Sequence, residues 1–506
     1  MSSIVSERPL HKHASFQALL GQRETWLVVA CVLALALLTR HVVVANTDVS
    51  WGFTLAEKLL AGERPYVDFI EVNPPVPIYL YLPAVVVARH IGLAPELVMD
   101  ALVFIVIGGS LWMAGRVLRR AGLLARFDSA KLLAMIMTIL AILPAQIFAE
   151  REHIALVLCL PMLSVMLARA HGAAPSRSAI VVAGLGAGAM MVLKPHLALG
   201  LAAMIATSAW SARSWRVLVA AENWIAGAVL AAYGAAIAIV FPEFLSETVP
   251  LLRAVYLPIR RSWWDMLIGL PAVPIWISTL VALVLLRRAG RYDRLYGILL
   301  AGSVGFSASF FIQGKGWPYH SYPMLALALF ALACAMSERP AQAGSPLWRG
   351  GWAVAAGFLA AVTFTWMNLA TSFTSLEAPI RQIKPHPTML AITHDIAVGH
   401  PLVRAVGGTW VASVGSMWIT RGAIWRRDHD ALTLEEGARL DRYVARDRAM
   451  LIDDLRNRKP DVILIQKEPV DFAAWARADA EIDGLLKAYR ETVTTPEMLV
   501  LRRDGP

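Results

Sequence analysis

The chain has 506 residues, of which 57% are hydrophobic and 17% are charged, and its formal net charge is +10. Apolar runs of about 20 residues recur along it, which is the length that a helix needs to cross a bilayer. This composition excludes a soluble globular domain and indicates a multi-span membrane protein. The basic residues form short clusters between the apolar runs, so the positive charge is a topology signal and does not indicate a nucleic-acid partner.

Eleven apolar runs are predicted to be membrane-spanning helices. They cover residues 25–44, 96–115, 132–148, 154–169, 179–193, 197–211, 217–241, 265–286, 295–312, 321–337 and 351–370. The first run could instead be a cleavable signal peptide, because Val43, Val44 and Ala45 resemble a cleavage site. Arg40 and His41 interrupt the run, and this favours an uncleaved first span.

An odd number of spans places the two termini on opposite sides of the membrane. If the N-terminal tail, residues 1–24, is cytoplasmic, the cytoplasmic connections hold 15 Lys and Arg residues, and the external connections after the first hold 6. This bias follows the positive-inside rule and predicts a bacterial inner-membrane protein with a periplasmic C-terminal domain. Residues 76–90 are apolar but short, and a full span there would reverse the bias, so we predict an interfacial or re-entrant segment.

The composition becomes polar after Pro379. We therefore predict a transmembrane domain over residues 25–378, with a first periplasmic loop at 45–95, and a soluble periplasmic domain over 379–506. In the second domain, helices are expected at 434–459 and 471–489, and strands at 461–465 and 497–501. The predicted fold class is an all-α polytopic membrane domain of about eleven helices with a small C-terminal α/β domain.

The first external loop carries acidic residues suited to chemistry. Asp48 leaves the first span and precedes a predicted surface helix at 49–61, and Asp68 and Glu71 follow that helix. A carboxylate at the membrane face can act as a general base on an acceptor hydroxyl, so Asp48 is the predicted catalytic residue. The simpler interpretation is that Asp48 only caps the helix. Asp68, Glu71 and Glu152 are predicted to be supporting acidic residues.

Cationic and histidine side chains lie at span ends that the predicted topology places on one side. They are Arg151, His153, Lys194, His196, Lys315 and His320. Together they would hold and neutralise a phosphate group, as Arg and Lys do in phosphoryl sites. Singly, each cation is more often an interfacial anchor, and each histidine a helix-end hydrogen bonder. Tyr66, Asn73, Trp317 and Tyr319 lie in the same segments and are predicted to line the substrate site.

Several of these segments resemble a known family. They are Asp48, Leu59-Leu60-Ala61-Gly62, Pro65-Tyr66-Val67-Asp68-Phe69, Asn73-Pro74-Pro75 and Tyr79-Leu80-Tyr81 in the first loop, with Arg151-Glu152-His153, Lys194-Pro195-His196 and residues 313–320 at later span ends. They resemble the GT-C membrane glycosyltransferases, which include the protein O-mannosyltransferases and the lipid A aminoarabinose transferases. The resemblance covers residues 25–340 as architecture. It implies an inverting transfer of a sugar from a polyprenyl-phosphate donor to a periplasmic glycan, lipid or protein acceptor, with Asp48 as the base.

The sequence departs from the commonest pattern of that family at two positions. Val49 follows Asp48 where an Asp-Glu pair is usual, and Asn73 stands where a Lys or His often precedes the two prolines. The use of a divalent metal therefore stays open, and no other cofactor is implied. Membrane lipid is an expected partner.

Two other functions stay open. A polysaccharide ligase of the O-antigen type also takes a polyprenyl donor, but it would not need a base-bearing surface helix directly after the first span. A transporter of lipid-linked sugars should carry ionisable residues at mid-membrane and show related halves, and the spans of this chain are nearly free of charge.

Overall fold

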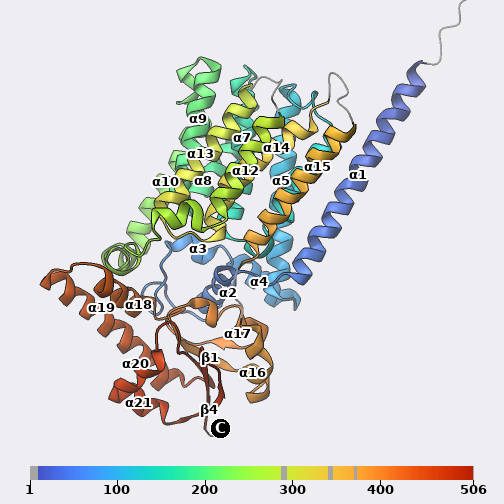
Figure 1. Ribbon diagram of the computed structural model, residues 1–506. Coiled ribbons are helices and arrows are strands. Elements are labelled where there is room, and N and C mark those ends of the chain that lie inside the picture. The colour runs from blue at the N-terminus through green and yellow to red at the C-terminus, as the bar shows by residue number, and fades with distance from the viewer. Residues whose placement is uncertain (1–9, 287–292, 340–345, 370–372, 505–506) are drawn as a thin grey trace, which may run out of the picture.

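The computed structural model describes residues 10–286, 293–339, 346–369 and 373–504. Long helices form a bundle at one end of the molecule, and a small sheet with flanking helices forms a domain at the other end (Figure 1). The helices α2 (Thr47–Leu60), α3 (Pro75–Tyr79) and α4 (Leu82–Ile91) of the first loop lie between these two parts (Figure 1). The predicted fold class, a polytopic helical domain followed by a small α/β domain, is confirmed.

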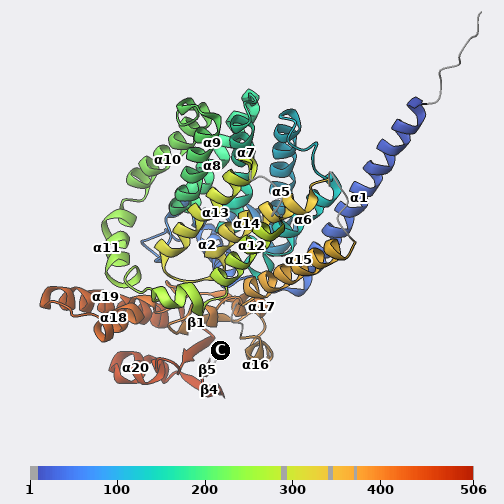
Figure 2. The ribbon, with the colours of Figure 1, turned by 45° about the horizontal axis from the view of Figure 1, so that its top comes forward.

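Each of the eleven predicted spans overlaps a helix of the bundle, but α6 (Ser129–Ala141) ends before the predicted end at 148, and α12 (Ala272–Leu286) begins after the predicted start at 265. Within the described residues, seven helices are long and apolar enough to cross a membrane: α1 (Leu10–Val42), α5 (Pro95–Arg120), α7 (Arg151–Ala170), α10 (Ala221–Val240), α13 (Arg294–Gln313), α14 (Pro318–Ser337) and α15 (Pro346–Met367). The shorter ones are α6 (Ser129–Ala141), α8 (Arg177–Leu193), α9 (Ala198–Ala212) and α12 (Ala272–Leu286). Figure 2 shows α1 and α15 on one side of the bundle and α10 on the other. Residue 370 and residues 1–9 of the predicted tail lie outside the described residues.

The segment 76–90 does not form one continuous helix. It is divided between α3, of 5 residues, and α4, of 10 residues, whereas a span needs about 20. α4 buries Val85 and Ala88 in the hydrophobic core of the bundle and ends with exposed Arg89 and His90. The interfacial placement of the segment stays a prediction.

Close packing of α8 depends on two glycines. A Cβ atom at Gly188 would lie 2.6 Å from the Cβ of Val229 on α10, and one at Gly186 would lie 2.3 Å from the carbonyl oxygen of Leu158 on α7. Either distance is far below van der Waals contact. Glycine therefore lets the three helices approach closely, as small residues do in membrane bundles.

The C-terminal domain is built on a five-stranded sheet of order β2–β1–β3–β5–β4. β1 (Thr388–Ile392) is parallel to β2 (Thr409–Trp410) and to β3 (Val462–Gln466), and β5 (Met498–Arg503) is antiparallel to β3 and to β4 (Tyr489–Thr494). Its helices are α16 (Glu377–Ile383), α17 (Leu402–Ala405), α18 (Trp418–His429), α19 (Leu434–Asp453), α20 (Phe472–Ala478) and α21 (Ala480–Leu486).

Most predicted elements of this domain are present. The predicted strands at 461–465 and 497–501 are confirmed as β3 and β5, and the predicted helix at 434–459 is α19 with a π-helical turn from Asp454 to Arg458. The prediction of one continuous helix at 471–489 is wrong. Asp479 separates α20 from α21, because its side chain caps α21 by accepting from the backbone N–H groups of Glu481 and Ile482.

The C-terminal domain packs on the first loop through charged and aromatic contacts. Arg404 pairs with Glu57 of α2 at 2.9 Å and also with Glu96 of α5. The rings of His400 and Trp51 meet edge to face with centroids 5.1 Å apart. The first loop is therefore held from both sides, by the bundle and by the domain.

Topology is tested by cysteine labelling. In a variant whose exposed native Cys31 is replaced by Ala, we introduce a single Cys either at exposed Gly122, after α5, or at exposed Ala431, after α18. An impermeant thiol reagent applied to cells with a permeabilised outer membrane should label the Cys at 431 and spare the Cys at 122. The reverse pattern would contradict the predicted orientation.

A second prediction concerns the Arg404 contacts. Arg404→Ala removes charge-assisted hydrogen bonds to Glu57 and Glu96 and should lower the free energy of unfolding by about 1.5–3 kcal/mol. The matched control is Arg427→Ala, because Arg427 and its partner Asp441 are both exposed and such pairs contribute at most about 1 kcal/mol. Thermal unfolding of the purified proteins compares the two, and equal effects would show that Arg404 does not anchor the domain.

Candidate active site

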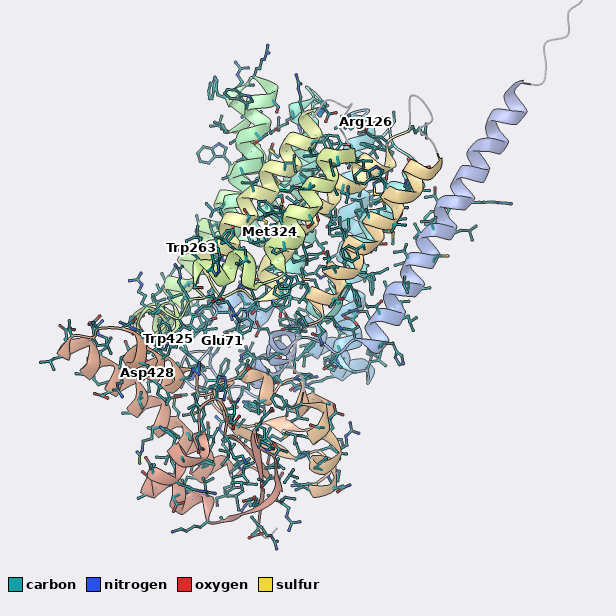
Figure 3. All side chains as sticks on the ribbon, in the orientation of Figure 1. Glu71, Arg126, Trp263, Met324, Trp425 and Asp428 are labelled. Atoms are coloured by element: carbon teal, nitrogen blue, oxygen red, sulfur yellow. The ribbon has the colours of Figure 1, made fainter. Side chains whose placement is uncertain are left out.

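Four helix ends bring predicted residues together at the junction of the bundle and the C-terminal domain. Asp48 lies in the first turn of α2. The other ends contribute Arg151 and Glu152 from α7, Lys194 from α8, and Tyr319 and His320 from α14. Glu71 of the first loop marks this junction in Figure 3, and Arg126 marks the opposite end of the bundle.

Asp48 is not the residue that caps α2. The N-cap is Asn46, whose side-chain oxygen accepts from the backbone N–H of Asp48 at 2.9 Å. This is the usual role of an Asn at that position. The simpler interpretation of Asp48 as a cap is therefore wrong, and its carboxylate is available for another contact.

The carboxylate of Asp48 pairs with the guanidinium of Arg151. Arg151 Nη2 donates to Asp48 Oδ2 at 2.7 Å, the side chain of Arg151 is 9% exposed, and that of Asp48 is 24% exposed. Glu150 Oε2 lies 3.7 Å from Nε of the same guanidinium. One cation at the start of α7 therefore lies near two carboxyl groups.

Glu152 holds the second cationic group. Its Oε1 lies 3.0 Å from Lys194 Nζ and 3.6 Å from His320 Nε2, and its side chain is fully buried. Lys194 Nζ also lies 5.9 Å from the centroid of the Tyr319 ring. The structure thus brings Glu152, Lys194, His320 and Tyr319 into one cluster next to the Asp48–Arg151 pair.

Two further residues at this site were not predicted. Glu150 is the N-cap of α7 and is fully buried; burial, followed by the neighbouring Asp48 carboxylate, raises its pKa to about 8. Tyr256 lies in the π-helical turn Leu252–Tyr256, and burial, followed by the Asp48 charge, raises its pKa. Glu150 could have been found by its place directly before Arg151, whereas the position of Tyr256 depends on the path of the whole connection between α10 and α12.

The other acidic residues of the first loop have structural partners. Buried Glu71 accepts from Trp51 Nε1 at 2.5 Å and from the backbone N–H of Asn73 at 3.0 Å, and Tyr66 Oη donates to the carbonyl oxygen of Asn73 at 2.6 Å. These contacts fix the loop that follows α2. Asp68 instead pairs with Arg64 four residues earlier, on an exposed surface, and so lies outside the cluster.

Lys315 lies apart from the Arg151 and Lys194 cations. Its Nζ donates to the carbonyl oxygens of Tyr256 and Ile259, at 2.6 Å each, and lies 4.1 Å from the centroid of the Tyr256 ring. Burial, followed by the charge of Arg260, lowers its pKa to about 8. Trp317, on the same connection, is 45% exposed. Lys315 thus packs against Tyr256.

Two histidines do not supply charge to a phosphate site. His153 Nδ1 accepts from the backbone N–H of Ala149 at 3.2 Å, and its Nε2 contacts the carbonyl oxygen of Leu140 at 2.8 Å, so both ring nitrogens are used inside the bundle. His196 Nε2 lies 2.7 Å from the amide nitrogen of Gln313. Burial, followed by the charge of Lys194, lowers the pKa of His196 to about 4, which leaves its ring neutral at pH 7.

The acidic residues at the described helix ends lie next to cations. Among the described residues, no three His, Cys, Asp or Glu side chains lie close enough together to hold a metal ion. Asp48 and Glu150 face one guanidinium, and Glu152 is turned toward Lys194 and His320. The donor set therefore fits a cation-paired cluster of carboxylates better than a divalent metal.

Comparison with known proteins identifies the fold. No protein-family model and no curated protein sequence matches the chain. Among solved structures, the crystal structure of ArnT from Cupriavidus metallidurans bound to undecaprenyl phosphate has a TM-score of 0.58 at 14% identity, over 94% of this chain and 97% of that one. A cryo-electron microscopy structure of the arabinofuranosyltransferase AftD from Mycobacteria gives 0.43 at 13% identity, over 96% of this chain and 40% of that one. The match along nearly the whole length of ArnT shows that this chain shares the fold of that protein.

Proposed function

We propose that this protein is a membrane glycosyltransferase that moves a sugar from a polyprenyl-phosphate donor to a hydroxyl group of a periplasmic glycan, lipid or protein. The observation that carries the proposal is the cluster of Asp48, Arg151 and Lys194 at one end of a membrane bundle. It combines a carboxylate that can accept a proton with two cations that can hold a phosphate. The ArnT structure with undecaprenyl phosphate shows that a protein of this fold binds such a lipid.

In the proposed reaction, Arg151 and Lys194 hold the phosphate of the donor. Asp48 takes the proton of the acceptor hydroxyl as its oxygen attacks the anomeric carbon of the sugar. The bond between that carbon and the phosphate oxygen breaks, and the electron pair stays on the phosphate. Attack from the face opposite the leaving group inverts the anomeric configuration. The cations stabilise the charge that develops on the leaving phosphate.

The placement of charged groups supports transfer over transport. A transporter needs ionisable groups at its mid-membrane binding site. Asp48, Arg151, Lys194 and His320 instead lie at helix ends, beside the first loop and the C-terminal domain. A site at this level meets both a lipid headgroup and a water-soluble acceptor.

The base is tested with a matched pair of substitutions. Asp48→Asn keeps the shape of the side chain and should slow transfer by about a hundredfold to ten-thousandfold, which is the usual contribution of a general base. Asp68→Asn is the control, because Asp68 pairs with Arg64 on an exposed surface and lies outside the cluster. It should keep most of the activity. The measurement is the release of undecaprenyl phosphate from its sugar-linked form by purified protein in nanodiscs. Near-normal transfer by Asp48→Asn would remove Asp48 from the proposed role.

Phosphate binding is tested by Lys194→Gln. Loss of one charge-assisted contact worth about 1.5–3 kcal/mol should weaken undecaprenyl phosphate binding roughly tenfold to a hundredfold. Lys384→Gln is the control, since Lys384 is 54% exposed and pairs with Asp461 in the C-terminal domain. Native mass spectrometry of nanodisc samples titrated with the lipid gives both affinities. Equal affinities would mean that Lys194 only neutralises Glu152.

A further inference from the structure

Both cations of the proposed phosphate site are already paired. Arg151 lies 2.7 Å from Asp48, and Lys194 lies 3.0 Å from Glu152. A phosphate that enters the site therefore brings a second negative charge beside a carboxylate that already holds the cation, and the two like charges repel each other. The ion pair that opens determines which carboxylate loses its cation and becomes a stronger proton acceptor.

Burial favours opening of the pair at Asp48. Glu152 is fully buried, so the departure of Lys194 would leave a charge away from water without its nearest cation. Uncompensated buried charges are strongly unfavourable. The side chain of Asp48 is 24% exposed, and water can solvate it when its partner leaves. Lys194 can contact a phosphate while it stays with Glu152, because an ammonium has three donors.

Arg151 has an N–H group available to contact the phosphate before the arginine leaves Asp48. Its Nε makes no hydrogen bond within the described residues, although Glu150 lies 3.7 Å from it. A guanidinium presents five N–H groups in a planar fork that matches phosphate oxygens two at a time. The arginine can thus turn from a carboxylate to a phosphate and remain next to Glu150.

We propose that Arg151 couples donor binding to the base: it holds Asp48 in the free protein and releases it when the donor phosphate takes the guanidinium. This inference rests on the proposed function. It makes Arg151 a positioning residue for Asp48 as well as a phosphate ligand. It also sets an order in which the lipid donor binds before the acceptor hydroxyl is deprotonated.

The contacts of Arg151 and the protonation of Asp48 change together during the catalytic cycle. While Arg151 bonds to Asp48, that carboxylate is a poor proton acceptor, because a nearby cation favours its charged form. After release, Asp48 accepts the proton of the acceptor hydroxyl as the new glycosidic bond forms and the bond to phosphate breaks. The phosphate then carries one more negative charge and keeps Arg151. Asp48 passes its proton to water, and departure of the polyprenyl phosphate restores the ion pair.

The test uses carbodiimide labelling of Asp48, followed by peptide mass spectrometry. Carbodiimides attack protonated carboxyl groups, which a paired guanidinium disfavours. In nanodiscs saturated with undecaprenyl phosphate, the labelling rate of Asp48 should rise by about tenfold over lipid-free nanodiscs, which is the effect of about 1.4 kcal/mol. Asp68, which pairs with Arg64 on an exposed surface, is the internal control and should not change.

Variants of Arg151 distinguish the release of Asp48 from shielding of Asp48 by the bound lipid. In Arg151→Gln, Asp48 should label fast with and without lipid, and any lipid effect in this variant measures steric cover alone. Arg151→Met serves if the first variant does not fold, and it should also label fast without lipid, because its side chain carries no charge to hold the carboxylate.

Three outcomes would overturn the inference. The first concerns the labelling rate of Asp48 with lipid divided by its rate without lipid. The inference fails if this ratio is no higher in the native protein than in the variant. The second is slow labelling of Asp48 in both Arg151 variants without lipid. The third is a native mass spectrum with no bound lipid. This result overturns the proposed function as well, whereas the first two outcomes overturn the coupling alone.

Discussion

The ion pair between Asp48 and Arg151 joins the first external loop to the membrane bundle, and the geometry of the site depends on it. Arg151 begins α7 with Glu150 and Glu152 on either side of it in sequence, and both of these carboxylates are buried. Buried charges need partners, so Arg151 pairs with Asp48 of α2, and Glu152 pairs with Lys194 at the end of α8. Apolar residues could stabilise such a junction equally well. The concentration of ionisable groups therefore favours a functional role.

The C-terminal domain supports this junction from outside the bundle. Arg404 and His400 contact α2 directly, and the ring of Trp418, at the start of α18, meets Tyr256 with centroids 6.0 Å apart. Tyr256 in turn lies against Lys315 of the bundle. The domain thus holds both the helix that carries the proposed base and the segment that covers it. We infer that loss of the domain would disorder the site even though the domain supplies none of the predicted charged ligands.

The sequence predicted the bundle well and the orientation of individual side chains less well. Runs of about 20 apolar residues rarely occur outside membrane-spanning helices, which is why every predicted span contains a helix. The cluster at 150–153 shows the limit. Successive residues on a helix point about 100° apart, so Arg151 reaches Asp48, Glu152 reaches Lys194, and His153 turns inward to the carbonyl of Leu140. Adjacency in sequence suggested one phosphate-binding group where the fold makes three different contacts.

The strands that sequence reasoning missed have equally physical causes. β1 and β2 have 5 and 2 residues, too few for an alternating pattern to stand out, and β1 is almost entirely buried, so it shows no alternation. β4 is mostly exposed and polar. Its position is fixed by pairing with β5, which is a long-range contact that local patterns do not report.

The central claim is that Arg151 and Lys194 hold the phosphate of a polyprenyl lipid beside Asp48. The most direct measurement is a cryo-electron microscopy map of the protein in nanodiscs with undecaprenyl phosphate. We expect phosphate density within hydrogen-bonding distance of both cations, with Arg151 turned away from Asp48. A lipid phosphate bound at another place, with Arg151 still paired to Asp48, would contradict the account.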